Sequence, residues 1–111
     1  MLDAVGQARL RALEGARFLD ELPEDILAPG WRARIRQGDL DIESPCRCMM
    51  GQLFGDFNEF VAEQDIPRGA LINLGVFEPG RRGPDRTRRY DLLTNAWKGV
   101  INEGLETVEY A

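Results

Sequence analysis

Histidine is absent from the 111 residues, and there are only two cysteines and a single lysine. Because a structural zinc site usually needs four Cys or His ligands, one chain cannot supply it. Histidine-dependent nucleophilic catalysis is excluded for the same reason. The patterns GxxxxGK[ST], GxGxxG and GxSxG are also missing, so the chain offers neither a phosphate loop nor a hydrolase elbow. We therefore expect a non-enzymatic protein with no catalytic residue, no metal and no cofactor.

Long apolar runs are missing too. No stretch approaches the roughly 18 apolar residues of a membrane span, and the first residues, MLDAVGQARLR, lack the apolar part of a signal peptide. Cys46 and Cys48 are separated by one residue, too close for a relaxed disulfide between them. These features predict a protein with reduced thiols in the cytoplasm, with no membrane partner.

The composition is that of an ordinary globular domain, with 43% apolar and 30% charged residues. A chain of this length buries enough surface for one core, so residues 1–111 are expected to form a single domain. Apolar residues recur mostly at helical spacing. We predict a mainly α fold.

The stretch 44–64, SPCRCMMGQLFGDFNEFVAEQ, is predicted to be one central helix. Ser44 is a favoured N-cap and Pro45 suits the first helical position. One face then gathers the bulky apolar residues, which are Cys46, Met49, Met50, Leu53, Phe54, Phe57, Phe60 and Val61. This face is expected to be the centre of the core, with Trp97 packed nearby.

Two further principal helices are predicted at 2–22 and 90–104, from apolar stripes of the same period. A short helix is expected at 31–37. The segments 39–43 and 70–77 are candidates for a minor β element, because the first alternates acidic and apolar residues and the second is apolar.

The opposite face of the central helix carries little bulk, in a strip made of Cys48, Gly51, Gly55 and Ala62. Glycine inside a helix costs about 0.5–1 kcal/mol relative to alanine, so two of them indicate close packing. The neighbour could be helix 2–22 or, as an interface, a second copy or a host protein. Cys48 would be reactive only if exposed at the helix start.

Residues 65–89 are predicted to be a long connection that is basic on an acidic body. The whole chain has a net charge of −5, whereas residues 67–89 hold six arginines against two acidic residues, a local charge of +4. Candidate contacts with a partner protein or with nucleic acid are Arg81, Arg82, Arg86, Arg88 and Arg89. The alternative is a solvated loop, because no aromatic residue lies among them to stack a base.

Acidic residues also cluster. Asp39, Asp41 and Glu43, or Asp56, Glu59 and Glu63, can be drawn as a divalent-metal site, but neither set has the spacing of a calcium loop. Solvated charge explains both sets better, and the Asp56 set lies where an exposed helix face would place its carboxylates.

The pattern C-x-x-G-Q-L-F-G-x-F at Cys48 to Phe57 resembles small accessory proteins encoded by tailed phages of actinobacteria. The motif is accompanied by Pro-Gly-Trp at 29–31, Gly-Val-Phe at 75–77 and Leu-Thr-x-Ala-Trp at 93–97, and the resemblance covers about 18–101. In that group the cysteine matching Cys48 recurs more often, which would leave Cys46 in the core. The group brings no established activity and implies a phage accessory protein in a bacterial cytoplasm.

Three functions follow as expectations. The leading one is a non-enzymatic accessory protein that binds and modulates a host bacterial protein. The alternatives are a nucleic-acid-linked regulator that uses the Arg81–Arg89 loop, disfavoured by the acidic balance, and an acidic inhibitor of a host nuclease. A homo-oligomer remains compatible with each.

Overall fold

The computed structural model describes residues 3–109, with side chains from Asp3 to Leu105. Helices dominate this range, and it contains no strand, so the predicted mainly α fold is confirmed. None of the described helices has the length and apolarity that a membrane span requires. The elements are α1 (Ala4–Asp20), α2 (Trp31–Arg34), the 3₁₀ helix η1 (Gln37–Asp39), α3 (Met49–Phe54), α4 (Phe57–Gln64), α5 (Arg68–Asn73) and α6 (Pro84–Glu109).

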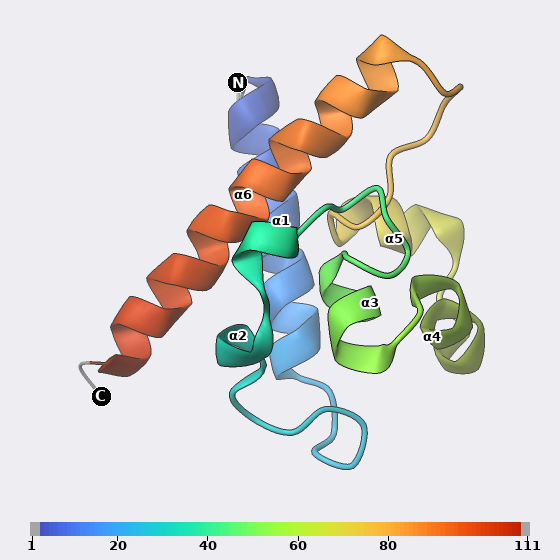
Figure 1. The fold of residues 1–111 in the computed structure, drawn as a ribbon. Coiled ribbons are helices and arrows are strands. Elements are labelled where there is room, and N and C mark those ends of the chain that lie inside the picture. Colours follow the sequence, from blue (N-terminus) through green and yellow to red (C-terminus); the bar gives the residue numbers. More distant parts are fainter. Residues whose placement is uncertain (1–2, 110–111) are drawn as a thin grey trace.

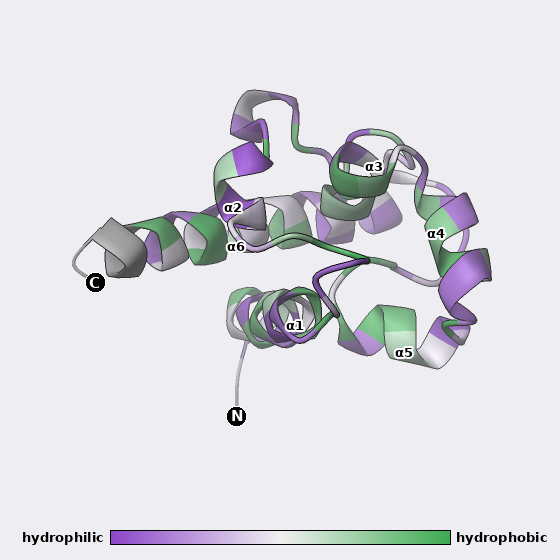
Figure 2. Cartoon of the chain, turned by 90° about the horizontal axis from the view of Figure 1, so that it is seen from below, coloured by the Kyte–Doolittle hydropathy of each residue, from purple (hydrophilic) through white to green (hydrophobic). Residues whose placement is uncertain are grey.

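Two long helices, α1 and α6, cross each other and form the frame of the molecule (Figure 1). Figure 2 shows α1 and α5 on one side of α6, with α2 and α3 on the other. Small residues of α1 face the crossing: Ala8, Ala12, Gly15 and Ala16 are all buried. Because these α1 residues have little bulk, side chains of α6 can fill the space between α1 and the helices on the other side of α6.

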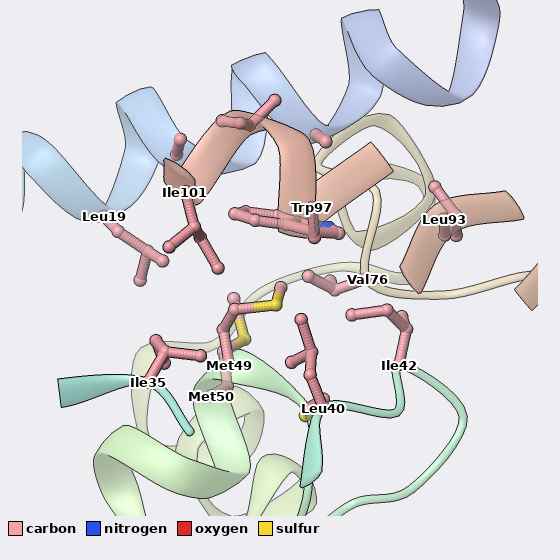
Figure 3. Close-up of a cluster of buried hydrophobic side chains, with 14 of the residues drawn as sticks. Leu19, Ile35, Leu40, Ile42, Met49, Met50, Val76, Leu93, Trp97 and Ile101 are labelled. Carbon is pink, nitrogen blue, oxygen red and sulfur yellow. The ribbon is translucent and has the colours of Figure 1, made fainter. Parts of the chain in front are cut away.

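Trp97 of α6 occupies that space and is fully buried (Figure 3). Its indole Nε1 donates a hydrogen bond to the Gly75 carbonyl over 2.8 Å, so its one polar atom is satisfied inside the core. The ring of Trp31 packs edge-on against it, with centroids 6.5 Å apart and an interplanar angle of 70°. Met49 and Met50 of α3 close the other side of the cluster.

The predicted central helix at 44–64 is broken into α3 and α4. Gly55 has a φ of +95° and ends α3, and the Asp56 carboxylate then accepts a hydrogen bond from the Glu59 N–H over 3.0 Å to start α4. A positive φ suits glycine, and aspartate is a preferred N-cap, so a new helix begins here in a new direction. The prediction followed the apolar period and missed this pair.

The start of that helix was also predicted wrongly. Ser44 caps a turn: its hydroxyl accepts hydrogen bonds from the N–H groups of Cys46 (3.4 Å) and Arg47 (3.2 Å). The helix begins only at Met49, where the Cys48 sulfur accepts from the Gly51 N–H over 3.3 Å.

The remaining bounds differ less. The predicted helix 2–22 is α1, which begins two residues later and ends two residues earlier. Leu2 lies outside the described residues. Helix 90–104 is α6, which begins earlier, at Pro84. Helix 31–37 ends at Arg34 and is followed by η1. The predicted β element is wrong, because α5 includes 70–73 and the segment 39–43 forms the end of η1 and a turn.

Replacing Gly15 with alanine tests the close approach of α1 to α6. A Cβ at Gly15 would overlap the Trp97 ring and the Leu74 carbonyl oxygen, whereas the nearest atom to a Cβ at Gly99 lies 4.0 Å away. We expect G15A to lower the free energy of unfolding by at least about 2 kcal/mol through overpacking. G99A should raise it by about 0.5–1 kcal/mol through helix propensity. Urea unfolding followed by circular dichroism measures both, and equal values would contradict the Gly15–Trp97 contact.

Candidate functional site

The five candidate arginines do not form one loop. Arg81 and Arg82 are exposed in the segment before α6, while Arg86, Arg88 and Arg89 belong to the first turns of α6. Arg89 donates hydrogen bonds to Glu78 (3.3 Å) and to the Pro79 carbonyl (2.8 Å). A basic connection over the whole of 65–89 was therefore a wrong prediction, since α5 and the start of α6 lie within it.

Arg86 also has a structural task. It donates to the Gly80 carbonyl over 3.3 Å, and its guanidinium lies 5.4 Å from the centre of the Tyr90 ring. Of the five arginines, Arg86 and Arg89 therefore hold the chain between α5 and α6 in place. Arg81, Arg82 and Arg88 are the exposed remainder.

Glu78 joins α1, the segment before α6 and α6 itself. The residue is 6% exposed, and its carboxylate forms ion pairs with Arg11 (2.5 Å) and Arg89 (3.3 Å). Arg11 also donates to the carbonyls of Ile72 and Phe77. Glu78 could not be singled out from the sequence, because Arg11 lies 67 residues away and Arg89 belongs to α6.

Cys48 is buried and Cys46 is exposed. The expectation that Cys46 belongs to the core was therefore wrong. Burial raises the pKa of the Cys48 thiol to about 11, so the sulfur stays protonated at neutral pH and is a poor nucleophile. Cys48 was expected to be reactive only if it were exposed at the helix start, and it is not exposed there. No three cysteine or carboxylate side chains of the described residues lie close enough together to hold a metal ion.

The strip of Cys48, Gly51, Gly55 and Ala62 does not lie along one helix. Gly51 is buried against the backbone of Pro45 and Cys46, where a Cβ would overlap the Pro45 carbonyl oxygen. Gly55 faces open space, and Ala62 is exposed on α4. Close packing at Gly51 is therefore real, but its neighbour is the turn before α3 and not helix 2–22.

Two depressions were not predicted, one beside α4 and one just beyond its C-terminal end. The first, about 290 Å³, lies between α4, the end of α3 and the loop after α1, and is lined by Asp25, Ile26, Phe54, Glu59, Phe60, Glu63 and Gln64. The second, about 410 Å³, lies between α1, the α4–α5 turn and α5, and is lined by Glu14, Phe18, Asp65, Ile66, Pro67, Ala70, Asn73 and Leu74. Gln64, the last residue of α4, lines the first depression, and Asp65, which follows it, lines the second.

The two chain segments that line the first depression carry charge of one sign. Residues 18–31 and 48–67 contain no lysine or arginine, while each segment contains four acidic residues. Both segments line the first depression, so it carries acidic groups from two parts of the chain. The lack of basic residues in these two segments is the feature of the sequence that could have located this surface.

Comparison of the chain with protein-family models, with curated proteins and with solved structures gave no match.

Glu78→Gln tests the link between α1 and α6. We expect a loss of about 1–3 kcal/mol in the free energy of unfolding, because Arg11 and Arg89 lose a buried acceptor. The matched control is Glu103→Gln, which removes an exposed carboxylate paired with Arg9 and should change stability by no more than about 0.5 kcal/mol. Denaturant titration of both variants gives the comparison, and a neutral effect of Glu78→Gln would count against the link.

Thiol labelling tests the placement of the cysteines. In the native protein at pH 8, iodoacetamide should modify Cys46 and leave Cys48 free, and denaturant should make both reactive. Trypsin cleaves after Arg47, so mass spectrometry reads the two cysteines on separate peptides. Rapid native labelling of Cys48 would contradict its burial.

Proposed function

We propose that this chain is a non-enzymatic accessory protein, of the tailed-phage kind that it resembles, which binds and modulates a host bacterial protein through the surface around α4. The observation that carries the proposal is the apolar depression between α1 and α5. Its lining is mostly apolar, from Phe18, Ile66, Pro67, Ala70 and Leu74, and includes the acidic residues Glu14 and Asp65, which form what we call its acidic edge. Glu14 is also paired with Arg17 over 3.8 Å.

This arrangement favours a particular kind of partner. An apolar side chain that enters the depression gains hydrophobic free energy, and the acidic edge favours basic residues beside that side chain. We therefore expect a host protein that presents an apolar anchor flanked by lysine or arginine. Such an anchor in a well-formed pocket is the usual source of binding energy in protein interfaces.

An acidic inhibitor of a host nuclease is the second candidate. It is favoured by the eight acidic residues of 18–31 and 48–67, which no basic residue in those segments offsets. Nucleases bind phosphates through basic surfaces, so an acidic surface competes for the same site. The nucleic-acid-linked regulator has less support, because Arg86 and Arg89 are engaged within the fold.

A pull-down with a matched pair of variants tests the leading proposal. Ala70→Arg fills the depression with charge, whereas Ala33→Arg adds the same side chain on exposed α2. Wild type and A33R should enrich the same host protein from an actinobacterial lysate. A70R should capture at least about ten-fold less of this protein, which corresponds to roughly 1.4 kcal/mol of binding free energy. Thermal melting checks that both variants fold.

Three results bear on the alternatives. Equal enrichment by all three baits would contradict binding at this depression, and the absence of any enriched host protein would contradict the function. A nuclease as the enriched protein, with its activity lost on binding, would favour the second candidate.

A further inference from the structure

The other depression beside α4, which we call the acidic pocket, combines an aromatic wall with a carboxylate rim. Phe54 and Phe60 stack with their ring centroids 3.9 Å apart and an interplanar angle of 6°. Asp25 enters from the loop after α1, and Glu59 and Glu63 come from α4. Aromatic side chains and carboxylates together are the chemistry that recognises an organic cation.

The aromatic pair exists because the chain bends at Gly55. Phe54 is the last residue of α3 and Phe60 lies inside α4, so the two rings meet only when α4 turns back over α3. The Phe57 N–H donates to the Pro45 carbonyl over 2.8 Å, which fixes the start of α4. Phe60 is buried while Phe54 is half-buried, so the pair is held by the core and still lines an open pocket.

The loop that carries Asp25 is held closed at its base by hydrogen bonds to Asp20, which we call the clasp. Asp20, at the end of α1, accepts two hydrogen bonds from Arg32 (2.7 and 2.9 Å) and one from Trp31 (2.9 Å). Hydrogen bonding to Arg32 holds the pKa of the Asp20 carboxyl below its usual value, so the clasp stays charged at neutral pH. Within the loop, buried Leu27 anchors the chain. The rim is therefore preformed on both sides.

Arginines of this chain already lie over aromatic rings elsewhere. Their guanidinium carbons are 4.5–5.4 Å from the ring centres, in the pairs Arg32–Trp31, Arg68–Phe77 and Arg86–Tyr90. In the described part of the chain no such pair involves Phe54 or Phe60, and no ion pair involves Asp25, Glu59 or Glu63. The acidic pocket thus offers an aromatic ring and carboxylates to a cation from another molecule. Elsewhere in the fold, such groups are contacted by arginines of this chain.

Glu63 is placed against its local preference. It lies in the last turn of α4, where the helix dipole disfavours a negative charge, and that turn contains no basic residue. Asp65 follows with a φ of +52°, a conformation that glycine adopts more readily. Two acidic side chains at this end of α4 therefore do not serve the stability of the helix.

We propose that the acidic pocket binds an arginine side chain of the partner protein, an inference that rests on the proposed function and specifies its chemistry. A planar guanidinium stacks on an aromatic ring and presents five N–H donors, so it can reach carboxylates on opposite sides of a pocket at once. A lysine ammonium is more strongly hydrated and gains less from the ring.

The test uses a small probe in place of the partner. Nα-acetyl-arginine methylamide is titrated into the ¹⁵N-labelled protein and followed by two-dimensional NMR. We expect saturable shifts at residues 25–26, 54 and 59–64, and at least five-fold weaker binding of the citrulline analogue, which has the same shape without the charge. Shifts that do not saturate, or equal binding of both probes, would overturn the proposal.

Matched variants assign the effect to the rim. Glu63→Gln should weaken arginine binding about three-fold or more while the melting temperature stays equal or rises, because the charge leaves the unfavourable end of α4. Glu43→Gln removes one exposed carboxylate outside the acidic pocket and should leave binding unchanged. Equal weakening by both variants would mean that the effect comes from net charge alone, and would overturn the assignment of arginine binding to the rim.

The outcomes separate this inference from the proposed function. Arginine binding without any captured host protein would leave the acidic pocket standing and remove the function. A host protein that is lost from A70R but bound equally by wild type and E63Q would keep the function and overturn the pocket. Self-association at NMR concentration that disappears in R81Q/R82Q would assign the pocket to a second copy, and so would overturn the partner assignment.

Discussion

How closely α1 approaches α6 decides the rest of the structure, and the absence of a side chain at Gly15 permits that approach. Trp97 fills the space that Gly15 leaves, and its indole is tied to the Gly75 carbonyl. That bond also fixes the chain after α5, from which Glu78 continues into its contacts with both long helices. Protein interiors tolerate little change in volume, so one added methyl group at the crossing disturbs every element attached to it.

The long helices and Trp97 could be predicted because a regular apolar period carries that information over many residues. Two boundaries were missed although local features marked them. Gly55-Asp56 combines a C-terminal glycine with an N-cap, and Gly83-Pro84-Asp85 places proline at the first position of α6 with an acidic residue behind it. In both places a stronger pattern, apolar spacing or arginine density, concealed the local feature.

The site was harder to predict than the fold, because its parts are joined by contacts between distant segments. Arg89 is a structural residue because it contacts Glu78. The aromatic wall of the acidic pocket forms because the chain bends at Gly55. What the sequence did contain was the separation of charge: segments without any basic residue lie together around α4, while three arginines remain exposed near the start of α6. Net charge alone conceals this uneven distribution of charge along the chain.

The pairing of α1 with α6 has a consequence for how the protein is made. The apolar stripe of α1 is synthesised before the side chains that cover it, because those side chains belong to α6. Until then the nascent chain has no closed core, and exposed apolar surface attracts chaperones and proteases. A message cut short before α6 therefore yields a chain that quality control can recognise and remove, whereas the core can close once α6 has left the ribosome.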